Sequence, residues 1–188
     1  MRHFLFALCF LAAAAPAPAA TTYALLVGGI GQAPYTRWTS DWLARFGTHL
    51  TKKAGVPAPQ VQVLTGDAAT SEAILKNIRE IGSRMQPEDQ FILLLSGHGE
   101  NTNTPTFAVK GPDLSAEQLA EALKTIPAKS QIILNFSASS GDFLKSLAAP
   151  NRVNIAATSP SEIKQPVFAE FFLRGLESGR GGTTLLEA

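Results

Sequence analysis

Residues 91–100 read FILLLSGHGE, an apolar run that ends in a histidine flanked by two glycines. Such a continuous apolar run, closed by glycine, is typical of a strand that is buried on both faces of a parallel sheet. We predict a strand over residues 91–96, then a loop over residues 97–112 in which residues 106–109 are extended. The histidine, His98, therefore stands where the chain leaves the sheet.

Strand and helix signals alternate along the rest of the chain. The other predicted strands are residues 23–27, 61–64, 131–136 and 153–157. Apolar residues at helical spacing predict helices over residues 39–54, 71–82, 115–126, 143–147 and 167–176. This alternation implies right-handed crossovers and a mostly parallel central sheet of about five strands with helices on both faces. The predicted fold class is thus a three-layer α/β/α sandwich in one domain.

Two of these helices carry start signals. Ser71 is a predicted N-cap, and Ser115 with Gln118 has the spacing of a capping box. Residues 183–188 resemble the beginning of another helix, which is too short to be stable alone. We therefore expect the natural chain to continue beyond Ala188.

The first nineteen residues have the pattern of a secretory signal peptide. Arg2 gives a positive start, residues 4–15 are apolar but too short to span a membrane, and Ala17-Pro18-Ala19 fits the small-residue cleavage rule. We predict cleavage after Ala19, a mature domain over residues 20–188, and a secreted or periplasmic location. The alternative is a buried N-terminal helix.

The cysteine content and charge balance of the chain exclude some classes of function. Cys9 is the only cysteine, so the mature chain would have neither a disulfide nor a thiol. The chain has 16 basic and 15 acidic residues, and removal of Arg2 leaves 15 of each. That balance gives no reason to expect a nucleic acid or an anionic membrane as partner, and no segment after the signal reaches membrane-spanning length. The sequence does not fix the oligomeric state.

No cofactor or metal is predicted. Gly29-Ile30-Gly31 after the first strand, with Asp67 after the second, hints at a dinucleotide fingerprint, but Pro34 stands at its third glycine. His98, Glu100 and Asp142 lack metal-ligand spacing and a second histidine.

Three predicted strand ends carry unusual residues. They are Gly28-Gly29 with Arg37 beyond, Gly97-His98-Gly99, and the small-residue turn 137–141. Ligands of open parallel sheets bind beyond the carboxyl ends of the strands, so these segments are expected to form one site. A histidine there can act as a general base, or it can merely close a loop. His3, in the signal, and His49, on the first helix, are poorer candidates.

The residues around His98 resemble the caspase–legumain superfamily of cysteine peptidases, in particular its legumain-like C13 branch. The resemblance covers roughly residues 23–175, and Ser-Gly-His-Gly after an apolar strand is its most specific part. The matched segments are 27–29, 35–41, 63–65, 96–100 and the turn before Gly141. The resemblance implies a caspase-like fold and a peptide or protein ligand in a groove at the strand ends.

In that family the histidine pairs with a cysteine in a pattern like Ala-Cys-x-Ser-Gly. Aligned without a gap, the alanine falls on Ser137, the cysteine on Ala138, the serine on Ser140 and the glycine on Gly141. Ala138 has no group that can attack a carbonyl. Ala138 is either the natural residue of a relative that is not a peptidase, or it replaces the cysteine in this chain.

Neighbouring hydroxyls offer an alternative nucleophile. Ser137 or Ser139 would need His98 within hydrogen-bond reach to act. The G-x-S-x-G elbow of serine hydrolases is absent. In the simpler interpretation these serines satisfy the turn and cap the next helix.

The resemblance assigns roles to several other residues. Gly99 matches the glycine whose backbone amide helps to form an oxyanion hole, and Arg37 matches the arginine that reaches a specificity pocket for Asp or Asn. Ser159 is expected to line the substrate groove. Phe136 departs from the acidic residue of the legumain pocket, and Asp142 is interpreted as a helix-start charge.

Two function classes follow from these observations. The first is a secreted pseudopeptidase that keeps the histidine and the groove but lacks the nucleophile. The second is an active endopeptidase, which would use a neighbouring serine, or whose cysteine has been changed to alanine in this chain.

Overall fold

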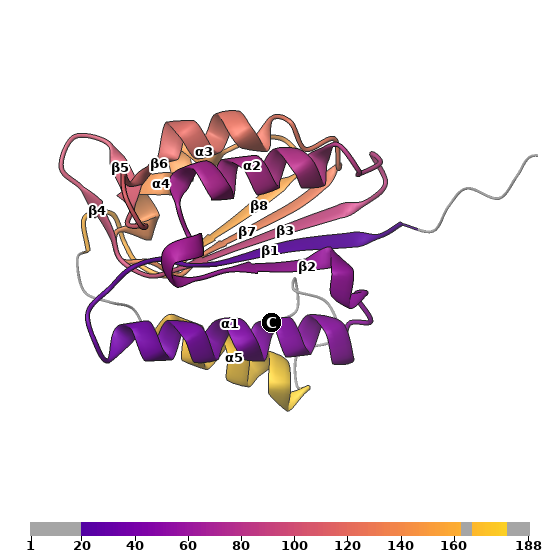
Figure 1. Ribbon diagram of the computed structural model, residues 1–188, viewed down its shortest axis with the longest axis horizontal. Helices are drawn as coiled ribbons and strands as arrows, with labels where there is room; N and C mark the ends of the chain where they lie inside the picture. The colour runs from indigo at the N-terminus through magenta and orange to yellow at the C-terminus, as the bar shows by residue number, and fades with distance from the viewer. Residues whose placement is uncertain (1–19, 163–166, 180–188) are drawn as a thin grey trace, which may run out of the picture.

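The computed structural model describes residues 20–162 and 167–179, which form an α/β fold around a parallel sheet (Figure 1). The sheet has five strands in the order β2-β1-β3-β7-β8, and every neighbouring pair is parallel. The strands are β1 (Thr22–Gly28), β2 (Val61–Leu64), β3 (Gln90–Ser96), β7 (Ser130–Asn135) and β8 (Arg152–Ala156). The predicted mostly parallel sheet is confirmed.

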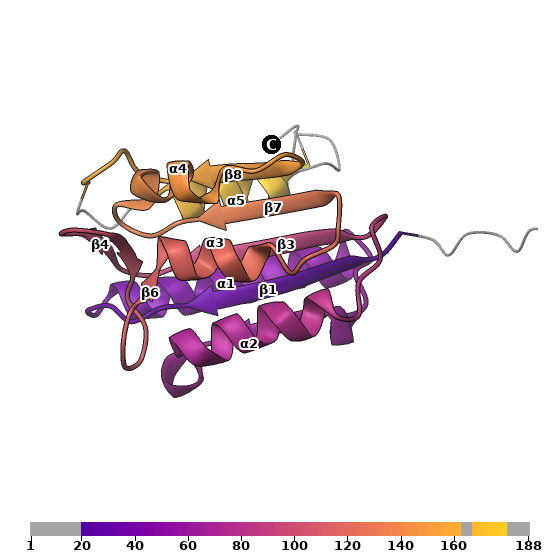
Figure 2. The ribbon, with the colours of Figure 1, turned by 90° about the horizontal axis from the view of Figure 1, so that it is seen from above.

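Helices cover both faces of this sheet, as Figures 1 and 2 show. The helices are α1 (Tyr35–Lys52) and α5 (Phe168–Ser178) on one face, and α2 (Ser71–Gly82), α3 (Ala116–Leu123) and α4 (Phe143–Leu147) on the other. The result is the predicted three-layer α/β/α arrangement. The predicted signal peptide, residues 1–19, and the helix start at residues 183–188 lie outside the described residues.

The side chains of the central strands point alternately to the two faces of the sheet and form two separate hydrophobic cores. Leu25, Leu93 and Ile133 pack toward α2, α3 and α4. Leu26 and Ile92 pack toward α1 and α5. Because successive strand side chains point to opposite faces, a fully apolar strand supplies both cores at once. Burial of each such side chain contributes about 1.5–3 kcal/mol, which makes the apolar runs the main determinant of the fold.

The strand order reverses between β1 and β3. From β1 the chain moves outward to β2, then returns to pair β3 on the other side of β1 and continues to β7 and β8. The crossover after β1 runs through α1 on one face, whereas the chain after β3 leads to α3 on the other face. Ligand sites of such sheets lie at this reversal, beyond the carboxyl ends of the two strands. Those ends are Gly28 and Ser96.

The structure corrects three local predictions. Helix α1 begins at Tyr35 rather than at residue 39, because a turn closed by Gln32 and a hydrogen bond from the Thr36 hydroxyl to the Gly31 carbonyl start it earlier. The N-cap of α2 is Thr70, whose hydroxyl accepts from the Ala73 amide, and not Ser71. The capping box of Ser115 is present as predicted.

The third correction concerns the loop predicted over residues 97–112. It contains most of a small antiparallel sheet in the order β4-β5-β6. These strands are β4 (Gly99–Asn101), β5 (Pro105–Phe107) and β6 (Leu114–Ser115). Strands of two or three residues carry no readable periodicity, so their pairing depends on the tertiary structure.

An ion cluster joins α1 to α5. The Arg45 guanidinium bonds Glu177 through Nε and Nη2 and Glu170 through Nη1, and Glu170 also accepts from Arg174 and from the Trp42 indole. The bonds from Arg174 and then from Arg45 lower the pKa of Glu170 to about 2. Since a depressed carboxyl pKa favours the folded state only while the group is ionised, this contribution is lost as the pH falls from 4.5 toward 2.

We therefore expect Glu170→Gln to lower the melting temperature at pH 7 and to lose that effect as the pH approaches 2. Melting temperatures of both proteins across this range test the prediction. Glu88→Gln is the matched control, since Glu88 is exposed and has no ion-pair partner among the described residues. A difference between wild type and Glu170→Gln that persists undiminished at pH 2 would contradict the assignment.

Candidate functional site

The loop that carries His98 is held by the end of β1. The Gly29 amide donates to the Ser96 carbonyl, the Ile30 amide to the Ala108 carbonyl, and the His98 amide to the Ile30 carbonyl. At Gly29 an ideal Cβ would lie 2.5 Å from the Ala108 oxygen, so only glycine permits this approach. The backbone of His98 is therefore fixed at the point where the strand order reverses.

The His98 side chain itself is exposed. Its imidazole has no hydrogen-bond partner within residues 20–162 and 167–179. A histidine that only closed a loop would be expected to use its ring nitrogens in that loop, whereas here the loop is closed by backbone groups alone. The ring is thus available to a ligand.

The residue after the histidine lies against the predicted nucleophile position. An ideal Cβ on Gly99 would lie 2.4 Å from the Ala138 carbonyl oxygen and 3.0 Å from the Ser137 hydroxyl. The turn after β7 and the histidine loop after β3 are therefore in direct backbone contact. The structure brings Gly99, the residue after His98, against Ser137 and Ala138, which lie roughly forty residues further along the chain.

Two backbone amides at this contact are not used by the fold. Gly99 faces Phe107 across the β4–β5 ladder, and the bond from the Ala108 amide to the His98 carbonyl makes Gly99 part of a non-hydrogen-bonded pair. The Ala138 amide donates to no group in the described part of the chain. A free backbone amide can donate to a carbonyl oxygen, so each of these two amides is available to a ligand.

Ala138 offers no chemistry of its own, and its side chain is fully buried. The neighbouring serines are buried too, and their hydroxyls have partners. Ser137 donates to Asn135 Oδ1 at 2.7 Å, and Ser139 lies 3.4 Å from the Glu162 carbonyl oxygen. Neither hydroxyl is bonded to His98, so the general base needed to activate a serine is not in place.

The serines instead shape the turn. Ser139 has a left-handed backbone with φ of 52°, and its amide donates to the Glu162 carbonyl at 2.7 Å. Ser140 exchanges hydrogen bonds with Thr158 through its amide and its hydroxyl. At Gly141 an ideal Cβ would lie 2.6 Å from Pro160 N. The turn is thus packed tightly against the loop that follows β8.

That loop, residues 158–162, forms the other wall of the turn. The exposed Ser159 donates to the Glu162 carboxylate through its amide at 3.2 Å and its hydroxyl at 2.9 Å. The Ser161 amide donates to Asp142 Oδ2 at 2.7 Å. Asp142 therefore joins two loops, in addition to standing at the start of α4 as the sequence predicted.

Sequence reasoning missed two residues here. Asn135 accepts from both the amide and the hydroxyl of Ser137, and it is 3% exposed while its Nδ2 has no partner in the described region. The sequence signal for Asn135 is a polar residue at the end of an apolar strand. Glu162 bonds Ser139 and Ser159. It gave no local signal in the sequence, because its bond to Ser139 joins the loop after β8 to the turn after β7.

The candidate specificity residue Arg37 lies in the first turn of α1, at the edge of the sheet where β1 ends. Its side chain is exposed and has no ion-pair partner among the described residues. Beside it, Tyr35 and Trp38 make an edge-to-face contact with ring centroids 5.2 Å apart. Phe136, in contrast, is fully buried against Phe168 and Phe172, with ring centroids at 5.4 and 5.3 Å, and faces the core under α5.

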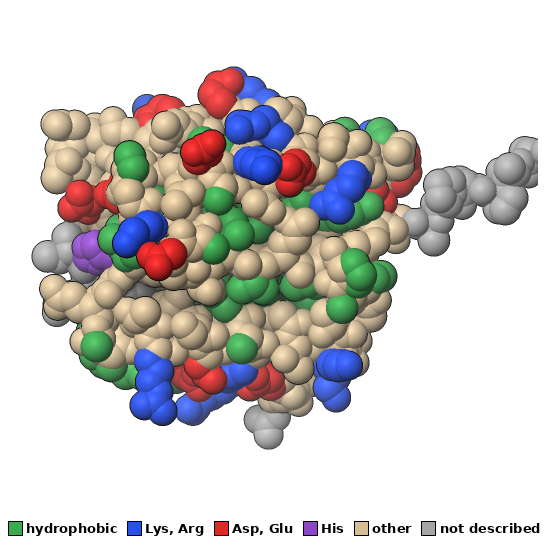
Figure 3. All heavy atoms as spheres, in the orientation of Figure 1, with side chains coloured by type: hydrophobic (Ala, Val, Ile, Leu, Met, Phe, Trp, Pro, Cys, Tyr) green, Lys and Arg blue, Asp and Glu red, His purple; other side chains and the backbone are tan. Residues whose placement is uncertain are grey.

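The surface charges are mixed. Figure 3 shows acidic and basic side chains interspersed on the face that it presents, without a large area of one sign. Within the described ranges, no group of three histidine, cysteine or acidic side chains could hold a metal ion. None of the described helices is long and apolar enough to cross a membrane.

Comparison with known proteins bears on the fold alone. No family model matches the chain, and no curated protein matches it either. Many solved structures are similar, among them the crystal structure of protein GSU0716 from Geobacter sulfurreducens, with a TM-score of 0.62 at 16% identity. That similarity covers 85% of this chain and 83% of the other. At so low an identity it establishes the shared α/β architecture and leaves the function to the site.

Proposed function

We propose that this protein is a secreted pseudopeptidase of the caspase–legumain type, which binds a peptide or protein at the carboxyl edge of its sheet without cleaving it. The carrying observation is the contact between Gly99 and Ala138, beside an exposed His98. In this proposal the free amides of these two residues hold a carbonyl oxygen of the ligand. The methyl group of Ala138 stands where a peptidase would have its nucleophile.

Ligand selection is assigned to Arg37. A guanidinium presents a fixed fork of donors, which suits the carboxylate of aspartate or the amide oxygen of asparagine. Its exposure and its lack of an ion-pair partner among the described residues leave this fork free. The aromatic rings of Tyr35 and Trp38 beside it offer apolar contact to a neighbouring side chain of the ligand.

The alternative, an active peptidase that uses a serine, is less well supported. It requires a hydroxyl that donates to His98, whereas the Ser137 hydroxyl donates to Asn135. The Ser139 hydroxyl lies next to the Glu162 carbonyl. The binding function therefore stands as the first candidate.

Binding of fluorescein-labelled peptides that contain a single Asp or Asn tests this proposal. We expect saturable binding by the unmodified protein, with the peptide intact by mass spectrometry. Arg37→Ala should weaken the binding by about tenfold to a hundredfold, the scale of a hydrogen bond to a charged group.

The matched control is Arg79→Ala, which removes an exposed arginine from α2 on the opposite helix layer. It should leave the affinity unchanged. Cleavage of the peptide by the unmodified protein, abolished by His98→Ala, would overturn the pseudopeptidase proposal in favour of an enzyme. Equal affinities for the two arginine variants would remove Arg37 from the site.

A further inference from the structure

The small antiparallel sheet beside His98 has a free edge. Its strand order is β4-β5-β6, so β4 has a neighbour on one side only within the described residues. Gly99, at the start of β4, is buried, and the strand becomes exposed at Glu100 and Asn101. An unpaired edge presents a row of backbone N–H and C=O groups that can pair with another extended chain.

The pairing of β4 with β5 decides which of its backbone groups face outward. Gly99 pairs with Phe107, and Asn101 pairs with Pro105. Proline has no N–H, so Asn101 and Pro105 cannot exchange two hydrogen bonds. Hydrogen-bonded and non-hydrogen-bonded pairs alternate in an antiparallel ladder, so Gly99 and Asn101 are both in pairs of the second kind. Their N–H and C=O groups therefore point away from β5, toward the free edge.

These outward groups are not used by the fold. The Asn101 amide and carbonyl, like the Gly99 amide, have no hydrogen-bond partner in residues 20–162 and 167–179. Two residues of a strand span about 6.8 Å, which is also the repeat of an extended peptide. A peptide whose carbonyl accepts from the Gly99 amide thus brings its next residue but one to Asn101. A helical peptide cannot make this pair of contacts, because its backbone groups are bonded within the helix.

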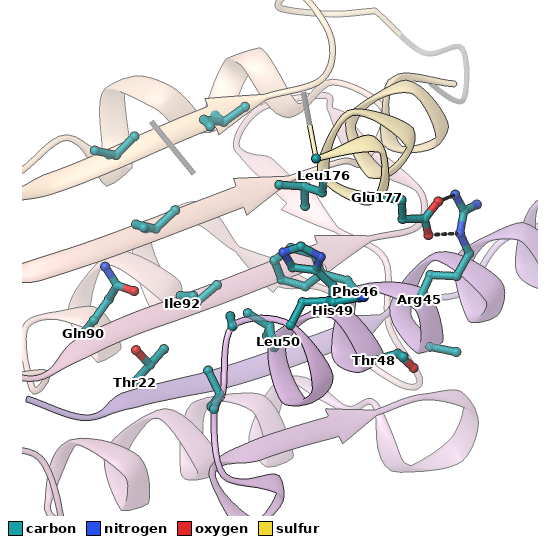
Figure 4. A pocket seen from close by; sticks show the side chains of 18 of the residues that line it. Thr22, Arg45, Phe46, Thr48, His49, Leu50, Gln90, Ile92, Leu176 and Glu177 are labelled. Carbon is teal, nitrogen blue, oxygen red and sulfur yellow. Dashed lines mark hydrogen bonds and ion pairs between the residues drawn. The ribbon is translucent and has the colours of Figure 1, made fainter. Parts of the chain in front are cut away.

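At the other end of the fold, the side chains pack among themselves. Phe46, Leu50 and Ile92 lie together between α1 and the sheet, as Figure 4 shows, and all three are buried in the core. Beside them, Arg45 and Glu177 bond each other. These groups are satisfied within the chain, whereas the outward groups of β4 are available to a partner.

We propose that the ligand binds as an extended strand along the outer edge of β4. This inference rests on the proposed function, since it gives the conformation in which the peptide is held and the backbone groups that hold it. The pairing begins at the Gly99 amide, next to His98, and continues at Asn101. Backbone hydrogen bonds supply affinity in strand addition and accept many side chains, so selection for Asp or Asn stays with Arg37.

N-methylation of the Asp and Asn peptides, one residue at a time, tests the proposal on the unmodified protein. A methyl group on an amide that faces β4 removes a donor and stands between strands that lie only about 4.8 Å apart. We expect the dissociation constant to rise by about tenfold or more at two positions that are two residues apart. N-methylation of the residue between them is the matched control, since its amide faces away from β4, and it should change the constant by less than about twofold.

Asn101→Pro tests the same edge from the protein side. It removes the outward amide and should weaken peptide binding by about threefold to tenfold, the scale of one neutral hydrogen bond. Asn103→Pro is the control, because Asn103 is exposed in the bend that follows β4.

Hydrogen exchange of the wild type gives a readout that does not depend on how proline is accommodated. The peptide should slow exchange of the Asn101 amide. It should leave exchange of the Glu100 amide unchanged, because Glu100 already forms a hydrogen-bonded pair with Thr106 of β5.

The outcomes separate this inference from the peptide-binding function. Peptide binding without the two-residue pattern in the N-methyl series would overturn strand pairing and leave the binding function in place. Binding that leaves exchange at Asn101 as fast as in the free protein would do the same. If no Asp or Asn peptide binds at all, both the binding function and the strand pairing are wrong.

Discussion

Gly99→Ala is expected to separate the histidine loop from the Ala138 turn and to abolish peptide binding. The added Cβ would lie 2.4 Å from the Ala138 carbonyl oxygen and 3.2 Å from that of Thr106, and both are backbone atoms that cannot rotate away. Overpacking of this kind costs about 1–3 kcal/mol. The same displacement moves both amides that would hold the ligand carbonyl. The variant should therefore lose stability and affinity together.

Gly31→Ala is the control for this substitution. Gly31 lies in the loop after β1, and an ideal Cβ there meets nothing within 4 Å. Chemical denaturation and peptide titration of both variants give the comparison. We expect Gly31→Ala to behave as wild type, whereas Gly99→Ala shifts the unfolding midpoint and raises the dissociation constant at least tenfold. Wild-type affinity in Gly99→Ala would show that the contact between the two loops does not build the site.

The sheet could be predicted from the sequence because its strands are apolar on both faces. Residues 91–95 and 132–134 are apolar on both faces, so only a strand between two helix layers buries them. Alternation with helices then limits the topology to parallel crossovers. The same reasoning placed His98 at the carboxyl edge, where the structure has it.

The remaining parts of the site depend on contacts between distant segments. The pairing of β4 with β5, which fixes Gly99, involves three residues on each strand. The bonds of Ser137 to Asn135 and of Ser139 to Glu162 decide that these hydroxyls are occupied, and no spacing rule encodes them. Sequence periodicity indicates which face of a helix is buried, but it does not give the distance from that helix to its neighbours.

Ala138→Cys is expected to convert the binding site into a peptidase. The substitution adds one thiol beside the His98 loop, at the position that the family resemblance gives to the nucleophile, while the backbone amides and Arg37 are retained. A cysteine is the strongest of the common side-chain nucleophiles when a base removes its proton. His98→Ala in the same background should lower the rate by about 10²–10⁴-fold, the usual contribution of a general base.

Cleavage of the Asp and Asn peptides by four proteins therefore tests the account most directly: wild type, Ala138→Cys, His98→Ala and the double variant. The account predicts cleavage by Ala138→Cys alone, next to an Asp or Asn residue, with the peptide bound but intact in wild type. If Ala138→Cys folds and binds the peptide yet does not cleave it, or if it cleaves equally well without His98, then His98 and Ala138 do not form the site proposed for them.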